Sequence, residues 1–113
     1  MQIIDDRIHF GSGAKNPLQS DNVQVYLKQV ADKWKANPKQ IIRIMGHTDY
    51  QGRRRANYIL GLKRGSAVRK VLMSHGIPKK KIKVNSMGEI KPIGNNKTKQ
   101  GRFLNRRVEI KIN

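Results

Sequence analysis

Apolar positions along the chain predict four strands and two long helices. The first strand is expected to end at the glycine-rich residues 11–13, and its apolar positions are Ile3, Ile4, Ile8 and Phe10. A first helix should follow, because apolar residues recur three or four positions apart, at Val23, Leu27, Val30, Ala31 and Trp34. Ser20 or Asp21 suits the N-cap of this helix, and Asn37-Pro38 suits its end.

The remaining pattern predicts three strands and the second helix. Residues 41–45 are mostly apolar and β-branched, which is typical of a central strand, and residues 82–84 predict another strand. The second helix is expected at residues 54–74, because Gly76 suits a helix C-terminus and Pro78 prevents continuation. Residues 88–100 are rich in Gly, Asn, Lys and Pro and predict a loop, while residues 108–112 alternate like a half-buried strand.

The order β-α-β-α-β-β predicts the α/β class, as a two-layer sandwich with a mixed sheet and both helices on one face. The chain has 113 residues, which is enough for one hydrophobic core. It shows no internal repeat and no linker-like segment, so residues 1–113 are expected to form a single domain of a larger protein.

The second helix carries a charged residue on the side that should face the core. At about 100° per residue, Ala56, Leu60, Ala67 and Val71 fall in one narrow sector, and Arg64 lies inside it. A buried cation must find partners, because an unpaired buried charge is costly.

Asp49, which lies between the predicted central strand and this helix, is the obvious partner for Arg64. One interpretation is an internal Asp49–Arg64 salt bridge. The other is a site for a ligand with both an ammonium and a carboxylate group, since Arg offers a planar fork to a carboxylate and Asp accepts from an ammonium. The spacing alone does not decide between them.

Composition adds a strong positive charge. The chain has 25 Lys and Arg residues against seven Asp and Glu, a formal net charge of +18, which attracts polyanions such as nucleic acid, lipid headgroups or an anionic envelope polymer. A basic nucleic-acid-binding domain is therefore the alternative function. Aromatic residues are only 5%, and no helix-turn-helix, zinc-finger or RNA-binding signature is present, so no specific nucleic acid is expected.

The residues show no catalytic constellation. The chain has no cysteine, and His47 has no second ligand at metal spacing, so a hydrogen-bonded structural histidine in a turn is expected. Asp49 lacks a partner carboxylate or an activated nucleophile. The sequence predicts a protein that is not an enzyme and needs no metal or cofactor. Of Arg102, Arg106 and Arg107, at least one is expected to pair with an acidic residue, either Glu89 or Glu109.

Several motifs together indicate a family. The chain carries Gly46-His47-Thr48-Asp49-x-x-Gly52, then Asn57-x-x-Leu60-x-x-x-Arg64-x-x-x-Val68 and Gly76-Ile77-Pro78. It continues with Gly88-Glu89-x-x-Pro92 and a long block that ends in Asn105-Arg106-Arg107-Val108-Glu109-Ile110. Over nearly its whole length the chain resembles the OmpA-like peptidoglycan-binding domain, a family that includes the C-terminal domain of OmpA, the Pal lipoprotein and the periplasmic part of MotB.

The resemblance implies a mixed sheet of order 1-4-2-3, in which the last strand is antiparallel to its neighbours. It also implies a ligand, the diaminopimelate group of the peptidoglycan stem peptide. By this analogy Asp49 takes the ammonium, Arg64 takes the carboxylate, and Asn57 lines the pocket. The backbone of Gly11 and Ser12, within residues 10–13, would close the other side, and Gln51 occupies a neighbouring position.

The function that the resemblance implies is noncatalytic anchoring of a cell-envelope protein to the cell wall. Such a domain is expected in the periplasm, in a parent protein held in the outer or inner membrane, and the family allows a homodimer. The chain departs from the family at Leu60-Gly61 and Arg64-Gly65. Glycine within a helix costs about 1 kcal/mol relative to alanine, so these two glycines either loosen the helix or allow close packing.

Overall fold

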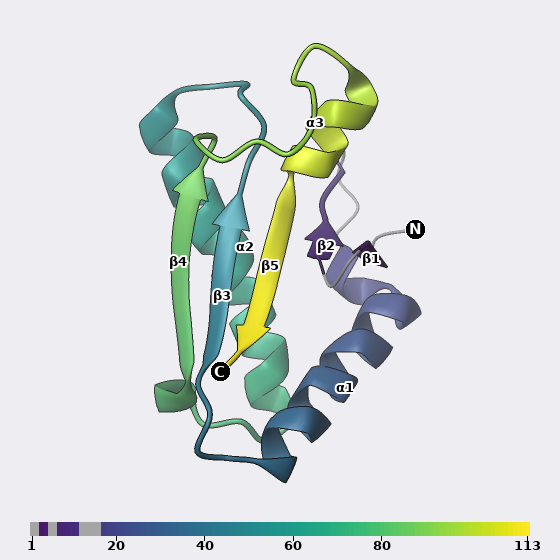
Figure 1. The fold of residues 1–113 in the computed structure, drawn as a ribbon, viewed down its shortest axis with the longest axis vertical. Coiled ribbons are helices and arrows are strands. Elements are labelled where there is room, and N and C mark those ends of the chain that lie inside the picture. The colour runs from purple at the N-terminus through teal and green to yellow at the C-terminus, as the bar shows by residue number, and fades with distance from the viewer. Residues whose placement is uncertain (1–2, 5–6, 12–16) are drawn as a thin grey trace.

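The computed structural model describes residues 3–4, 7–11 and 17–113. Five strands form one sheet in the order β1-β2-β5-β3-β4 (Figure 1). Their bounds are Ile3–Ile4 for β1, Arg7–His9 for β2, Ile42–His47 for β3, Ile82–Gly88 for β4 and Arg107–Ile112 for β5. Strand β5 is antiparallel to both β2 and β3, while β3 and β4 are parallel.

Two long helices cover one face of this sheet. Helix α1 spans Asp21–Ala36 and helix α2 spans Arg54–Ser74. In Figure 1, α2 passes behind β3 and β5, and α1 runs below β1 and β2. The core between the layers joins Val23 and Leu27 of α1 and Leu72 of α2 to Ile44 and Val108 of the sheet. Without β1, the strand order is the predicted 1-4-2-3, so the predicted two-layer mixed architecture is confirmed. Among the described residues, no helix combines the length and the apolar character needed to cross a membrane.

The predicted helix ends are also confirmed. Ser20 is the N-cap of α1 and Asn37 is its C-cap, and α2 has the predicted bounds. Gly76 follows α2 with φ +95°, a left-handed conformation that glycine adopts without steric cost.

The predicted buried stripe of α2 is only partly confirmed, because Ala67 and Val71 are half-buried against the core but the positions nearer the start of the helix are not. Ala56 and Leu60 are exposed, and the face that meets the sheet consists of Asn57, Gly61, Gly65, Val68 and Leu72. A Cβ on Gly61 would lie 2.1 Å from Ser86 Oγ, and one on Gly65 would lie 2.8 Å from Val84 Cγ1. The two glycines therefore allow α2 to pack closely on β3 and β4. Of the two effects considered for them, a loosened helix or close packing, the structure shows close packing. Apolar periodicity missed this face because glycine contributes no apolar side chain.

The N-terminal and C-terminal elements also differ from the prediction. The first predicted strand is two short antiparallel strands, β1 and β2. Strand β4 continues to Gly88, and residues 99–105 form a short helix, α3 (Lys99–Asn105), whose N-cap Thr98 accepts a hydrogen bond from the Gly101 amide at 2.9 Å.

Asn105, fully buried at the end of α3, fixes the segment before this helix. Its Oδ1 accepts from the amides of Ile93 at 2.8 Å and Gly94 at 2.7 Å, and its Nδ2 donates to Gly94 O at 3.0 Å. The Asn105 side chain therefore helps to hold the loop that composition predicted here.

Candidate functional site

The segment that follows β3 holds Asp49 in a fixed position. The Thr48 amide donates to Gly88 O at 2.8 Å, and the Thr48 hydroxyl donates to Asp49 O at 3.0 Å. The Gln51 amide donates to Asp49 Oδ1 at 2.9 Å. Gly52 has φ +94° and turns the chain toward α2. Asp49 is 7% exposed, so its carboxylate is largely protected from water but is not sealed off.

The charged partner of Asp49 is Arg106. Its Nη1 donates to Asp49 Oδ2 at 2.8 Å, and its Nε donates to Phe10 O at 2.7 Å. The Phe10 amide in turn donates to Arg106 O at 2.7 Å. Arg106 therefore ties the end of β2 and the start of β5 to the segment after β3. The Asp49–Arg64 salt bridge considered from the spacing is not formed.

Arg64 lies beside this pair with donors that are not used. Its guanidinium carbon is 4.9 Å from the centroid of the Phe10 ring, and its buried Nη1 has no hydrogen-bond partner. Burial lowers the pKa of Arg64, the positive Arg106 lowers it further, and the negative Asp49 acts in the opposite direction. A buried guanidinium group with a free donor favours an anionic ligand.

Asn57, in the first turn of α2, organises the same region. Its Nδ2 lies 3.0 Å from Gln51 O, 3.3 Å from Asp49 O and 3.3 Å from Glu89 Oε1. The side chain is 5% exposed, so these contacts fix the segment before α2 against the segment after β4. The Asn57 side chain therefore positions Asp49 by a hydrogen bond to the backbone carbonyl of Asp49.

The structure brings most of the predicted site residues together. Asp49, Gln51 and Asn57 are linked by hydrogen bonds, and Arg64 lies over Phe10, close enough to Asp49 and Arg106 for their charges to act on it. Gly11 follows Phe10 and is exposed. Ser12, the other loop residue of the predicted site, lies outside the described residues.

Sequence reasoning missed the role of Arg106 in this site. It expected at least one of three C-terminal arginines to pair with Glu89 or Glu109, and Arg107 does donate from Nε to Glu109 Oε2 at 2.8 Å. The signal for Arg106 was its position one residue before the strand: neighbouring strand residues point to opposite faces, so Arg106 and Arg107 face different partners.

His47 does not form the predicted hydrogen-bonded turn. It is the last residue of β3, is 3% exposed, and neither ring nitrogen has a hydrogen-bond partner. Its Nε2 lies 3.4 Å from Glu109 Oε1. Burial and then the charge of Arg107 lower the pKa of His47 to about 4. Within the described part of the chain, no three His, Cys, Asp or Glu side chains gather as a metal site.

Acid should therefore destabilise the fold through His47. The pKa of His47 is about 4 in the folded chain and 6.5 in the unfolded chain, so between these pH values the unfolded chain binds more protons. The contribution of neutral His47 is complete above pH 6.5 and is lost as the pH falls toward 4, by up to about 3 kcal/mol. Urea unfolding measured across this range should show a weaker pH dependence in His47→Gln. Equal slopes in the two proteins would contradict the assignment.

The sequence of this chain is similar to that of a known protein family. The model of the OmpA family matches residues 9–106. The peptidoglycan-binding protein ArfA of Mycobacterium tuberculosis is 36% identical over 106 residues, which cover 94% of this chain and 32% of ArfA. The chain thus spans about a third of the length of this relative.

Solved structures show the same fold. The peptidoglycan-associated lipoprotein of Burkholderia pseudomallei superposes with a TM-score of 0.86 at 28% identity, covering 96% of this chain and 91% of the other. The C-terminal domain of Helicobacter pylori MotB superposes with a TM-score of 0.80 at 28% identity, covering 96% of this chain and 84% of the other. In both cases nearly the whole of the described fold is shared.

Proposed function

This chain belongs to the OmpA family, and we propose that it binds peptidoglycan without catalysing a reaction on it. Two of its relatives support this proposal by name: one is described as peptidoglycan-binding and the other as peptidoglycan-associated. The candidate site supports it as well, because it offers fixed hydrogen-bonding groups, among them the Asp49 carboxylate held by Gln51 and Arg106.

The group we propose as the ligand is the diaminopimelate side chain of the stem peptide. The observation that carries this proposal is the free, buried Nη1 of Arg64 near the carboxylate of Asp49. A guanidinium group suits the ligand's carboxylate. Asp49 accepts one bond from Gln51 and one from Arg106, and a carboxylate has about four acceptor positions, so capacity remains for an ammonium group.

The other predicted residues have supporting roles in this proposal. Asn57 holds the Asp49 segment in place, and the backbone amide of Gln51 fixes the carboxylate of Asp49. Phe10 forms the wall behind Arg64. The role of the backbone of Gly11 and Ser12 in closing the pocket rests on the family resemblance alone. Phe10 and Arg106 are bound to each other through two hydrogen bonds, so the wall and the salt bridge move as a unit.

The cellular setting follows from the same proposal. A domain that binds peptidoglycan in this way works in the periplasm or against the wall, and it anchors a parent protein held in the outer or inner membrane. We propose this role because two relatives are described by name as peptidoglycan-binding and as a peptidoglycan-associated lipoprotein. A homodimer is compatible with the proposal.

Titration of meso-diaminopimelate into the labelled domain, followed by NMR, tests the ligand. We expect shifts centred on Asp49, Asn57 and Arg64, and a much weaker response to lysine, which lacks the second carboxylate. Asp49→Asn should weaken binding about tenfold, because the acceptor of the ammonium loses its charge. Asp32→Asn is the matched control, since Asp32 is exposed on α1 and pairs only with Lys28.

An equal response to lysine would mean that Arg64 does not bind the second carboxylate of the ligand. A diffuse response of surface lysines and arginines to any anion would refute the pocket altogether. Circular dichroism of Asp49→Asn must show a folded domain, because this change also weakens the contact with Arg106.

A further inference from the structure

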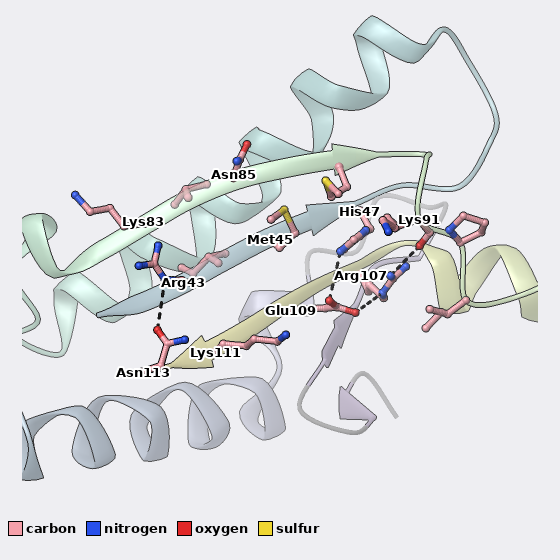
Figure 2. A pocket seen from close by; sticks show the side chains of 15 residues that line it. Arg43, Met45, His47, Lys83, Asn85, Lys91, Arg107, Glu109, Lys111 and Asn113 are labelled. Carbon is pink, nitrogen blue, oxygen red and sulfur yellow. Dashed lines mark hydrogen bonds and ion pairs between the residues drawn. The ribbon is translucent and has the colours of Figure 1, made fainter. Parts of the chain in front are cut away.

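The face of the sheet opposite the two long helices carries a second candidate site. A groove of about 790 Å³ runs over β3, β4 and β5 and is bordered by the segment after β4 (Figure 2). A Cβ on Gly46 would meet Gly61, so position 46 of β3 faces α2. The side chains of its neighbours Met45 and His47 therefore lie on the opposite face of the sheet. The groove is therefore separated from Asp49 and Arg64 by the thickness of the sheet.

One end of the groove is a row of three cations. Arg43 on the central strand β3 pairs in register with Lys83 on β4 and with Lys111 on β5, and all three are exposed. Strands lie about 4.8 Å apart, so the three side chains start within about 10 Å of one another. No described carboxylate lies within ion-pair distance of any of them, and the Nε of Arg43 donates to Asn113 Oδ1 at 3.3 Å. Like charges in register repel, so this row favours an anionic partner.

The middle of the groove is apolar. Met45 and Met87 are half-buried there, and Pro92 and Ile93 rise from the segment after β4, with Ile93 47% exposed. Methionine side chains are flexible and polarisable, and they adapt to apolar groups of different shapes. The groove thus combines uncompensated positive charge with a surface that gains free energy by covering an apolar side chain.

The single carboxylate in the groove does not neutralise the cation row. Glu109 accepts from Arg107 Nε at 2.8 Å and from Arg7 Nε at 3.0 Å. Burial alone raises the pKa of Glu109, but the hydrogen bond and charge of Arg107 hold it below its ordinary value. Arg107 also donates to Lys91 O at 2.9 Å, so these groups form a closed network at the other end of the groove (Figure 2).

We propose that this groove binds an extended acidic peptide segment of a partner protein, with carboxylates at the cation row and an apolar side chain over Met45 and Met87. The exposed cations Arg43, Lys83 and Lys111 support an acidic partner, and their position side by side across three strands suits an extended one. A nucleic acid fits less well, since no aromatic residue lines the groove for bases to stack on.

Fluorescence anisotropy with a short labelled peptide of glutamates and two leucines tests the proposal. The triple variant Arg43→Gln, Lys83→Gln, Lys111→Gln should bind the peptide at least about tenfold more weakly. Its matched control, Arg54→Gln, Lys63→Gln, Lys70→Gln, removes the same charge from exposed positions on α2 and should lose less than about twofold. Replacing both leucines of the peptide by serine should also weaken binding, because the apolar floor stays uncovered.

Methyl NMR places the peptide on the surface. The methyl signals of Met45 and Met87 should shift, while that of Met73, exposed on α2, should not. Equal losses of peptide affinity in the two triple variants, or an unchanged affinity after the leucine replacement, would mean that binding depends on net charge alone. Either result would overturn the proposal. Larger Met45 and Met87 shifts with duplex DNA than with the peptide would overturn it in favour of nucleic acid.

Discussion

Replacing Gly46 by alanine should destabilise the domain by about 3 kcal/mol or more. The added Cβ would lie 2.1 Å from the carbonyl oxygen of Gly61 and 2.8 Å from its Cα. Both atoms belong to the backbone of α2, so no side-chain rotation relieves the contact, and the helix must move away from β3. Urea unfolding followed by circular dichroism measures the loss.

Gly65→Ala is the comparison that isolates this effect. Its Cβ would meet side-chain methyl groups, Val84 Cγ1 at 2.8 Å and Ile44 Cγ2 at 3.3 Å, and alanine recovers about 1 kcal/mol of helix propensity. We expect Gly65→Ala to cost well under half as much as Gly46→Ala. If the two substitutions had equal effects, contact with the helix backbone would not be the cause.

Replacing Arg64 by alanine should abolish retention of the domain on purified peptidoglycan sacculi. Two charge-assisted hydrogen bonds to a carboxylate contribute about 3 kcal/mol together, which corresponds to roughly a hundredfold in affinity. Arg64→Lys keeps the charge but loses the planar fork, so we expect an intermediate loss of about tenfold. We expect stability to change little, because the loss of the contact with Phe10 is offset by the removal of a buried charge whose Nη1 has no hydrogen-bond partner.

The Arg64 experiment requires moderate salt and a matched variant. Arg69→Ala removes the same side chain from α2 more than one helical turn away, and salt suppresses attraction that depends only on net charge. Retention of Arg64→Ala equal to that of Arg69→Ala would mean that the basic surface, and not the pocket, holds the domain on the wall.

The sequence was sufficient for the architecture because local signals agreed with the final fold. Apolar alternation predicted the last strand, and Asn37 and Gly76 ended the helices where expected. The face of α2 was not predictable in this way, since Gly61 and Gly65 act through the side chain they lack. Helix α3 was missed because its composition is that of a loop, although Thr98 is a residue type that is favoured at the N-cap.

The sequence did not predict the internal pairing of the candidate site. Asp49, Asn57 and Gln51 are joined as neighbours, in agreement with what the family resemblance implied for them. The choice of Arg106 over Arg64 as the partner of Asp49 depends on where β5 begins relative to β3, a tertiary relation that spacing along one helix does not contain. The cation row on the open face was missed for the same reason, because it depends on the register between three strands.

The central place of β5 bears on when this domain can fold. Strands β2 and β3 do not touch each other, and each pairs with β5, the last of the five strands along the chain. The sheet therefore stays divided until residues 107–112 have emerged from the ribosome. Pairings between such distant segments also form slowly. The fold therefore closes only after nearly the whole chain has been made.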